Sequence, residues 1–300
     1  MKILYTGANG LLGQKISAAT PQYSNHAFLA TARGLNRTKN LGTASYAAMD
    51  ITDRKGIEHV LSAYRPDVII HGAAMTHVDE CEEHKELAYK LNVIGTQNIV
   101  DASKEIDAHV VHISTDFIFD GKDGPYDEKG VPNPVSYYGE TKLKAERIVQ
   151  ALDSWSILRT VLVIGVAGDL SRSNIVLWAK GALEKAQPIR VVDDQFRTPT
   201  LAEDLAQGAL LAATQKAQGI FNISGPDFMS IYELVQAVAK HFNLSMETVT
   251  RVDSSTLNQP AMRPPRTGFD ISKAVENLGY RPHGFKEALE IIAQQAGLYF

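Results

Sequence analysis

The sequence of 300 residues lacks features that mark several classes of protein. Its single cysteine, Cys81, excludes an internal disulfide and suits a reducing compartment. No apolar run approaches the roughly 20 residues that a membrane-spanning helix needs. No long basic run accompanies the net charge of -4, which argues against a nucleic-acid partner. The first strand leaves no space for a signal peptide, so we expect a cytoplasmic protein with neither a membrane nor a nucleic-acid partner.

Three glycines spaced three residues apart follow a short β-prone run at residues 2–6. Apolar residues then recur at helical spacing, so the turn joins a strand to a helix. Gly7 permits the tight turn, Gly10 lets the backbone approach a pyrophosphate, and Gly13 allows the helix to pack closely on the strand. The helix N-terminus would present N–H groups and a partial positive charge to the phosphates. The segment predicts a dinucleotide-binding corner, and an ordinary structural turn is the alternative.

The segment after the second predicted strand bears on the choice of cofactor. An Asp or Glu at this place binds the adenosine 2′-hydroxyl and selects NAD. Residues 32–37 contain no carboxylate but include Arg33 and Arg37. Because a guanidinium suits a 2′-phosphate, we predict NADP(H), held by Arg33 alone or with help from Arg37. The alternative is that Arg33 is a solvated surface arginine.

Alternating strand and helix patterns over the first half of the chain predict a parallel sheet. The near-continuous apolar run at residues 66–71 suits a strand buried on both faces. Other predicted strands lie at 27–31 and 110–113, and a further strand ends at 49–53. We expect one helix from about residue 76 to about 103. The pattern predicts an α/β fold of Rossmann type, a doubly wound parallel sheet with a smaller C-terminal α/β substrate lobe.

The pattern changes at about residue 165. We therefore predict a nucleotide-binding domain over residues 1–164, to which the chain returns at about 193–222, and a mainly substrate-binding lobe over 165–300. The lobe would close over the substrate. Its expected elements are a helix that begins within 173–179, a strand at 189–192, and helices at 201–213, 231–241 and 285–296.

Two groups of metal-type side chains do not form a convincing metal site. Residues 76–84 mix carboxylates with Cys81 and two histidines, but their spacing matches no zinc site. Acidic residues at the start of a helix are instead favoured by its dipole. His109 and His112 lie on opposite faces of a strand, which makes them poor candidates for a joint site. We predict no metal site.

Tyr138 and Lys142 lie four residues apart in a helix that follows a proline-marked loop, so they share one helical face. A phenol has a pKa of about 10, and a nearby ammonium would lower that pKa by stabilising the phenolate. Lys142 can do this while binding a nicotinamide ribose. The strand that ends at Ser114 and Thr115 brings a hydroxyl to the same sheet edge. We interpret these groups as the proton-transfer site of a reductase, and an ordinary pair on a helix surface is the alternative.

Together these motifs resemble the extended short-chain dehydrogenases/reductases and, within them, the dTDP-4-dehydrorhamnose reductase family. The resemblance covers most of the chain. Its most family-specific motif is Ser-Thr-Asp-Phe-Ile-Phe-Asp-Gly at 114–121. The other matching segments are 6–13, 73–76, 78–79, 138–142, 193–195 and 199–200.

The resemblance implies NADPH-dependent reduction of the C4 keto group of a nucleotide-linked 6-deoxy sugar, with dTDP-4-dehydrorhamnose as the first candidate. Thr115, or alternatively Ser114, would be the catalytic hydroxyl. Tyr138 would donate the proton, and Lys142 would modulate it. The implied cofactor-binding residues are Gly7, Asn9, Gly10, Leu11, Leu12, Gly13, Arg33, Asp50, Ile51, Ala73, Ala74, Thr76, Asn92, Tyr138 and Lys142. The implied substrate-binding residues are Thr76, Phe117, Arg197 and Arg263.

Some of these positions carry alternatives or depart from the family pattern. Arg263, before a proline, would hold the nucleotide diphosphate, or it is a solvated arginine of a rigid loop. Val161 and Leu162 stand where these reductases usually carry Ser-Trp, and Arg197 replaces a glycine. The first change removes a stacking surface and the second adds a charge near the substrate, so another sugar stays open. Phe117 stands where sugar 4,6-dehydratases carry a glutamate, which argues against dehydration.

Two other functions stay open. A nucleotide-sugar epimerase that retains its cofactor would use Tyr138 and Lys142 in the same way. A non-catalytic NADP-binding regulatory subunit, similar to that of methionine adenosyltransferase, shares the fold and much of the motif set. The sequence leaves open the sugar, the nucleotide and a homodimer, and nothing in it supports a requirement for Mg²⁺.

Overall fold

A sheet of seven parallel strands forms the centre of the computed structural model, which describes residues 1–168 and 174–297. The strands lie in the order β11-β6-β5-β4-β1-β2-β3. Their bounds are β1 Lys2–Thr6, β2 Ala27–Ala32, β3 Ser45–Ala48, β4 Val68–His71, β5 His109–Thr115, β6 Trp155–Thr160 and β11 Gly219–Ile223. The strand order reverses between β1 and β4, so the predicted doubly wound parallel sheet is confirmed.

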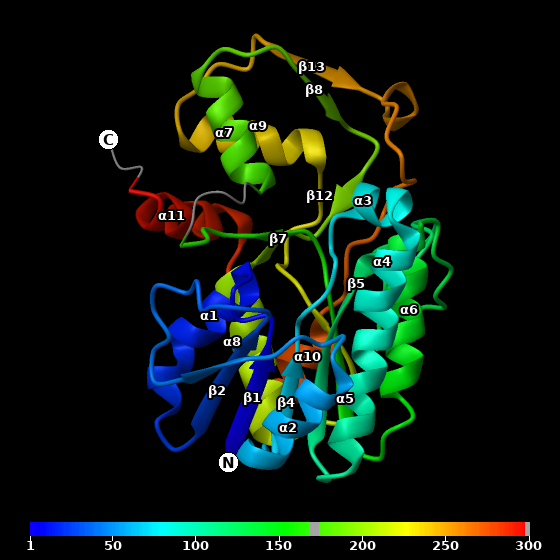
Figure 1. Cartoon of the computed structure of the whole chain (residues 1–300). Helices are drawn as coiled ribbons and strands as arrows, with labels where there is room; N and C mark the ends of the chain where they lie inside the picture. The colour runs from blue at the N-terminus through cyan, green and yellow to red at the C-terminus, as the bar shows by residue number, and fades with distance from the viewer. Residues whose placement is uncertain (169–173, 298–300) are drawn as a thin grey trace.

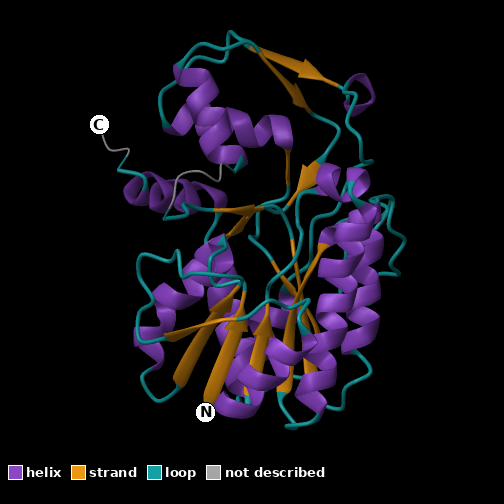
Figure 2. Cartoon of the chain, viewed as in Figure 1, coloured by secondary structure: helices purple, strands orange, loops and turns teal. Residues whose placement is uncertain are grey.

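Helices cover both faces of this sheet (Figure 2). Alternate side chains of β1 serve opposite faces, so Ile3 and Tyr5 join one apolar core and Leu4 joins another. The helices on the first face are α1 Leu11–Ala19, α8 Ala202–Gln215 and α10 Ser272–Leu278. Those on the second face are α2 Arg54–Tyr64, α5 Gly95–Lys104 and α6 Tyr137–Val149.

The single helix expected from about residue 76 to about 103 is wrong in its continuity. The structure divides it into α3 Val78–Glu83, α4 Lys85–Tyr89, a π-helical turn Lys90–Ile94 and α5. His84, with φ of -123° and ψ of 59°, interrupts the helix between α3 and α4. The π-helical turn holds Asn92, and such turns often occur at functional sites.

The smaller lobe lies beyond the carboxyl ends of the sheet strands (Figure 1). Its core is formed by α7 Ile175–Glu184, α9 Ile231–His241, α11 Phe285–Gln295 and β8 Ile189–Val192. β8 pairs in parallel with β13 Val249–Val252. Two short pairs join β7 Val163–Ile164 to β10 Thr200–Leu201 and β9 Phe196–Arg197 to β12 Met229–Ser230. Residue 173, where the expected helix would begin at the earliest, lies outside the described residues.

The chain passes between the two parts more than once. After β8, it returns to the sheet through α8, which packs on α1, and through β11, which pairs with β6. After β13 it returns again as α10, which packs on α8 and β11. The predicted division of the chain into two domains near residue 164 therefore stays a proposal. Among the described residues, no helix combines the length and apolar character needed to cross a bilayer.

Candidate functional site

The three glycines form a tight corner between β1 and α1. Gly7 has a φ of 77°, and a Cβ on it would lie 3.2 Å from backbone atoms of Ala73. A Cβ on Gly13 would lie 2.4 Å from the Gly7 carbonyl oxygen, because α1 packs directly on the strand end. α1 begins after Gly10 without a side-chain cap, which leaves its first N–H groups for another acceptor. A corner of this shape fits a dinucleotide pyrophosphate.

Hydrogen bonds from Asn9 hold the loop after β2 beside this corner. Its amide nitrogen donates to the Leu35 carbonyl at 3.0 Å, and its amide oxygen accepts the Arg37 N–H at 2.8 Å. Arg33 is exposed, and its guanidinium has no hydrogen bond or ion pair with any residue that the structure describes. The loop therefore presents a free guanidinium close to the glycine corner.

The other predicted cofactor residues follow neighbouring strands. Asp50 and Ile51 come after β3, where the Asp50 carboxylate accepts the N–H and hydroxyl of Thr52 at 2.8 Å and 2.9 Å. Ala73 and Ala74 follow β4, and Thr76 is exposed. The structure brings these positions to the same edge of the sheet as the glycine corner, as parallel strands require.

Thr115 and Tyr138 meet at the carboxyl end of β5. Both are buried, with exposed fractions of 6% and 7%. The Thr115 hydroxyl donates to Asp116 Oδ1 at 3.1 Å and accepts the Phe117 N–H at 3.3 Å. The Phe117 ring meets the Tyr138 ring edge-on, with centroids 5.7 Å apart. Ser136 caps α6, so the first turn of that helix delivers Tyr138 to this place.

Ser114, the alternative hydroxyl, is engaged elsewhere. It donates to Glu146 Oε1 at 2.6 Å. Arg159 also binds Glu146, through contacts of 2.9 Å and 3.1 Å, and both charged side chains are almost fully buried. This network leaves Thr115 as the hydroxyl beside Tyr138, which favours Thr115 over Ser114 for the catalytic role.

Lys142 lies on the same helix as Tyr138, but its ammonium is directed to β5. Nζ donates to the Ile113 carbonyl at 2.7 Å and lies 3.2 Å from His112 Nε2. Burial lowers the pKa of Lys142 from 10.5 to about 8, while the charge of Glu146 acts to raise it. Among the described residues, no hydrogen bond joins the ammonium to the Tyr138 hydroxyl. No effect of the Lys142 charge on the Tyr138 pKa is found among the described residues, and the modulation of Tyr138 by Lys142 stays a prediction.

Burial instead raises the pKa of Tyr138 above its ordinary value of 10.0. A side-chain hydrogen bond with Thr115 opposes this shift, and the charges of Asp116 and Cys81 add to it. The phenol is consequently protonated throughout the neutral range. This state suits a group that donates a proton.

Asn92 connects the loop after β4 to α6. Its amide nitrogen donates to the Met75 carbonyl and to Thr141 Oγ1, each at 3.0 Å, and its amide oxygen accepts the Met75 N–H at 2.8 Å. Thr141 donates in turn to the Tyr138 carbonyl at 2.8 Å. Asn92 therefore supports the position of α6 through side-chain contacts with both segments.

The two arginines expected at the substrate already have carboxylate partners. Arg197 is 3% exposed, and its Nε lies 3.6 Å from Asp116 Oδ2 while another guanidinium nitrogen donates to the Pro264 carbonyl at 2.8 Å. Arg263 pairs with Asp79 at 2.7 Å and, by its hydrogen bond, holds the pKa of that carboxyl below its usual value. Contact of either arginine with substrate stays a prediction.

The segment 76–84 forms a capped helix start. His77 Nδ1 accepts the Glu80 N–H at 3.3 Å. Cys81 is buried, its thiol lies 3.6 Å from the Met75 carbonyl, and burial raises its pKa to about 11. Within the described parts of the chain, no group of three or more His, Cys, Asp or Glu residues could hold a metal ion.

Sequence reasoning missed the buried polar side chains that surround the predicted groups. The residues concerned are His71, Asp116, Glu146, Arg159 and Thr267, together with the contact between His112 and Lys142. One available signal was a histidine in each of two apolar strands, His71 in β4 and His112 in β5. Aligning those strands in parallel would have placed the two histidines side by side.

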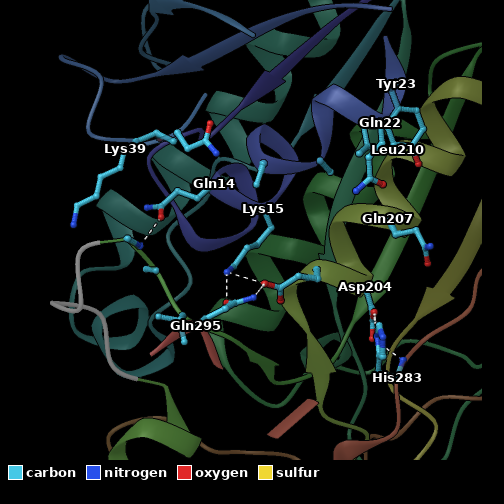
Figure 3. A pocket seen from close by; sticks show the side chains of 18 of the residues that line it. Gln14, Lys15, Gln22, Tyr23, Lys39, Asp204, Gln207, Leu210, His283 and Gln295 are labelled. Carbon is cyan, nitrogen blue, oxygen red and sulfur yellow. Dashed lines mark hydrogen bonds and ion pairs between the residues drawn. The ribbon is translucent and has the colours of Figure 1, made fainter. Parts of the chain in front are cut away.

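A cavity of about 810 Å³ opens away from these groups, between α1, α8 and the end of α11 (Figure 3). On its wall, Lys15 Nζ binds both Gln295 Oε1 and Glu203 Oε1 at 2.7 Å. Elsewhere on the wall, His283 Nδ1 lies 2.7 Å from Asp204 Oδ1. None of the residues predicted as catalytic, cofactor-binding or substrate-binding lines this cavity in the part of the chain that is described.

Comparison with known proteins agrees with this geometry. The family described as RmlD substrate binding domain matches residues 1–297. Spore coat polysaccharide biosynthesis protein SpsK of Bacillus subtilis is 32% identical, over 98% of this chain and 97% of its own. Methionine adenosyltransferase 2 subunit beta of Danio rerio is 30% identical, over 93% of this chain and 85% of its own.

Two solved structures of dTDP-4-dehydrorhamnose reductases are also similar. The Clostridium acetobutylicum protein is 30% identical with a TM-score of 0.86, covering 99% of this chain and 100% of its own. The Bacillus anthracis protein, solved in complex with NADP, is 27% identical with a TM-score of 0.83, covering 98% and 99%. With its glycine corner, its Thr115–Tyr138 pair and a match along nearly all its length, the chain belongs to the RmlD substrate binding domain family of Rossmann-type proteins.

Proposed function

We propose that this protein is an NADPH-dependent reductase of the C4 keto group of a nucleotide-linked 6-deoxy sugar, with dTDP-4-dehydrorhamnose as the first substrate to test. The observation that carries the proposal is the buried pairing of Thr115 with Tyr138 on the sheet edge that also holds the glycine corner. The similar reductases support the same chemistry.

The residues of the corner fit the cofactor. The uncapped start of α1 after Gly10 would receive the pyrophosphate, and the free guanidinium of Arg33 would receive the 2′-phosphate. Bound NADPH supplies a hydride to the substrate carbonyl carbon. The NADP complex of the Bacillus anthracis relative supports NADP(H) as the cofactor.

Tyr138 and Thr115 would act on the substrate oxygen. The Tyr138 phenol, whose pKa burial raises above its ordinary value, holds its proton at neutral pH, and it would deliver that proton to the new alkoxide, which is a stronger base than a phenolate. Thr115, whose backbone ends β5, would orient that oxygen by its hydroxyl. Asp116 and Arg197, buried behind Thr115, hold this strand end in place.

The direct test is NADPH oxidation, followed at its near-ultraviolet absorbance, with dTDP-4-dehydrorhamnose generated in the cuvette. We expect turnover with NADPH and slower turnover with NADH. Absence of turnover in a protein shown to bind NADPH would reject this sugar as the substrate and direct the search to other keto sugars.

A regulatory subunit is the second candidate, because subunits beta of methionine adenosyltransferase 2 match the chain about as closely as the reductases do. The test is complex formation with a catalytic methionine adenosyltransferase on size-exclusion chromatography, with a change in that enzyme's rate.

The epimerase alternative predicts a cofactor that stays bound through purification. A cytoplasmic location and a homodimer stay predictions.

A further inference from the structure

A row of titratable side chains crosses the sheet beneath the proposed active site. His71 on β4 and His112 on β5 are register partners, and their rings lie 5.4 Å apart with a tilt of 38°. Lys142 on α6 continues the row, with Nζ 3.2 Å from His112 Nε2. All three side chains are nearly inaccessible to solvent. The family resemblance gives Lys142 a role beside Tyr138 in the proposed reaction and leaves both histidines without one.

The hydrogen bonds around His71 define its protonation. Thr6 Oγ1 accepts the N–H groups of Gly72 and Ala73 at 3.1 Å and 3.0 Å, so its own proton is free for His71 Nδ1, 3.0 Å away. Nδ1 therefore accepts, and Nε2 carries the ring proton and donates to Thr96 Oγ1 at 3.1 Å. Both nitrogens of His71 are satisfied, which makes this histidine a structural link.

His112 is arranged differently. An ammonium has only donors, so Lys142 donates one hydrogen to the Ile113 carbonyl and a second to His112 Nε2. The ring proton of His112 must then lie on Nδ1, which is buried and has no hydrogen-bond partner among the described residues. A buried N–H without a hydrogen-bond partner lowers the stability of the fold. In His112 this N–H results from placing the acceptor nitrogen, Nε2, toward the buried Lys142 ammonium. Burial and the Lys142 charge hold the pKa of His112 well below 6.5, so the ring is neutral.

We propose that His112 is a positioning residue of the proposed reductase site: its neutral Nε2 holds the Lys142 ammonium against the end of β5 and sets the pH at which Lys142 loses its charge. The contact leaves the third ammonium hydrogen uncommitted among the described residues, free for a ligand. The inference rests on the proposed function for the catalytic use of Lys142. The protonation of Lys142 itself can be measured without substrate or cofactor.

The charge of Lys142 depends on its whole surroundings. The titratable groups that act on it or respond to its charge are His71 on β4, His112 on β5 and Glu146 on α6. Burial dominates and lowers the pKa of Lys142 to about 8, against the raising effect of Glu146. Arg159 pairs with Glu146 and weakens that effect. Loss of the His112 acceptor should lower the pKa of Lys142 further, because the ammonium would lose a hydrogen bond in a buried place.

The first readout is the free energy of unfolding as a function of pH, measured with urea. The pKa of Lys142 is about 8 in the folded chain and 10.5 when unperturbed, so the unfolded state binds more protons between these values. Stability therefore rises with pH across this window, and below about pH 8 the buried ammonium reduces stability in full. Each protein is compared with its own Lys142→Met variant, which cancels the titration of all other groups.

Three variants separate positioning from simple stability. His112→Phe keeps a ring but removes the acceptor nitrogen. The rise of unfolding free energy with pH should then begin at a pH lower by on the order of one unit. His112→Gln keeps an acceptor and should move the onset back toward that of the wild type. His71→Phe, the matched control on the neighbouring strand, loses two hydrogen bonds and should lower stability at every pH with the onset unchanged.

An unchanged onset in His112→Phe, or an equal shift in His71→Phe, would overturn the proposal. The proposal also fails if the wild type and its Lys142→Met variant show the same rise of unfolding free energy with pH. In the reductase assay, the alkaline limb of the pH profile of kcat should shift with the onset in His112→Phe. Failure of every keto sugar in that assay would refute the proposed function and leave the unfolding result standing.

Discussion

The glycine corner at β1 and the proposed catalytic cluster at β5, formed by Thr115, Tyr138, Lys142 and the buried polar side chains around them, lie on one edge of one sheet but depend on opposite properties of their residues. The corner occupies a single segment, Gly7–Gly13, and works through backbone atoms that side chains would displace. The cluster collects polar and charged side chains from β4, β5, β6 and α6 and buries all of them. The corner is sensitive to added atoms, whereas the cluster is sensitive to removed partners.

The strongest test of the cluster is Tyr138→Phe. The change removes the proton donor while keeping the ring that packs on Phe117. We expect kcat for the keto sugar to fall roughly a hundredfold to ten-thousandfold, with NADPH affinity nearly unchanged. Steady-state kinetics and fluorescence titration of NADPH would measure the two quantities. Turnover close to that of the wild type would contradict the role given to Tyr138.

The buried ion pair behind the cluster gives the next largest effect. Arg159→Met leaves the Glu146 carboxylate buried without its cation and should cost about 3 to 5 kcal/mol of unfolding free energy. Arg54→Met is the matched control, because its pair with Glu58 is exposed to solvent and should add no measurable stability. Urea denaturation compares the two variants. Equal losses of unfolding free energy in the two variants would show that burial does not make the Arg159–Glu146 pair more important for stability than the Arg54–Glu58 pair.

An added methyl group tests the corner. Gly13→Ala places a Cβ within 2.4 Å of the Gly7 carbonyl oxygen and should cost about 1 to 3 kcal/mol of unfolding free energy. Gly181→Ala in α7 is the control, since nothing lies within 4 Å of the new Cβ and the helix should gain about 0.5 to 1 kcal/mol. Denaturation curves should therefore shift in opposite directions. A gain in both variants would show that α1 can move away from the strand.

The smallest expected effect concerns the adenosine end of the cofactor. Arg33→Ala removes the exposed guanidinium and should weaken NADPH binding about tenfold to a hundredfold, with NADH little affected. Arg37→Ala serves as the comparison on the same loop, because its backbone N–H, which binds Asn9, is retained. Equal losses for NADPH and NADH in Arg33→Ala would place the 2′-phosphate elsewhere.

The predictable parts of the fold are those with local signals. Apolar runs and helical periodicity located the sheet strands, and the glycine spacing located the corner, because each depends on neighbours along the chain. The continuous helix at 76–103 was wrong, since the structure breaks it at His84 and at the π-helical turn, and α3, α4 and α5 each pack beside α6. Pattern alone cannot register such breaks.

The same division runs through the candidate site. By itself, the sequence determined the corner, the hydroxyl pair at the end of β5 and the helix that carries Tyr138 and Lys142, because these are short segments with distinctive composition. Only the tertiary structure decided which partner each buried or half-buried charge has. Lys142 binds His112, 30 residues away, and Arg263 binds Asp79, 184 residues away. Such pairs depend on strand register and on how loops return to the sheet, and buried charges accept only the partners that this packing brings within reach.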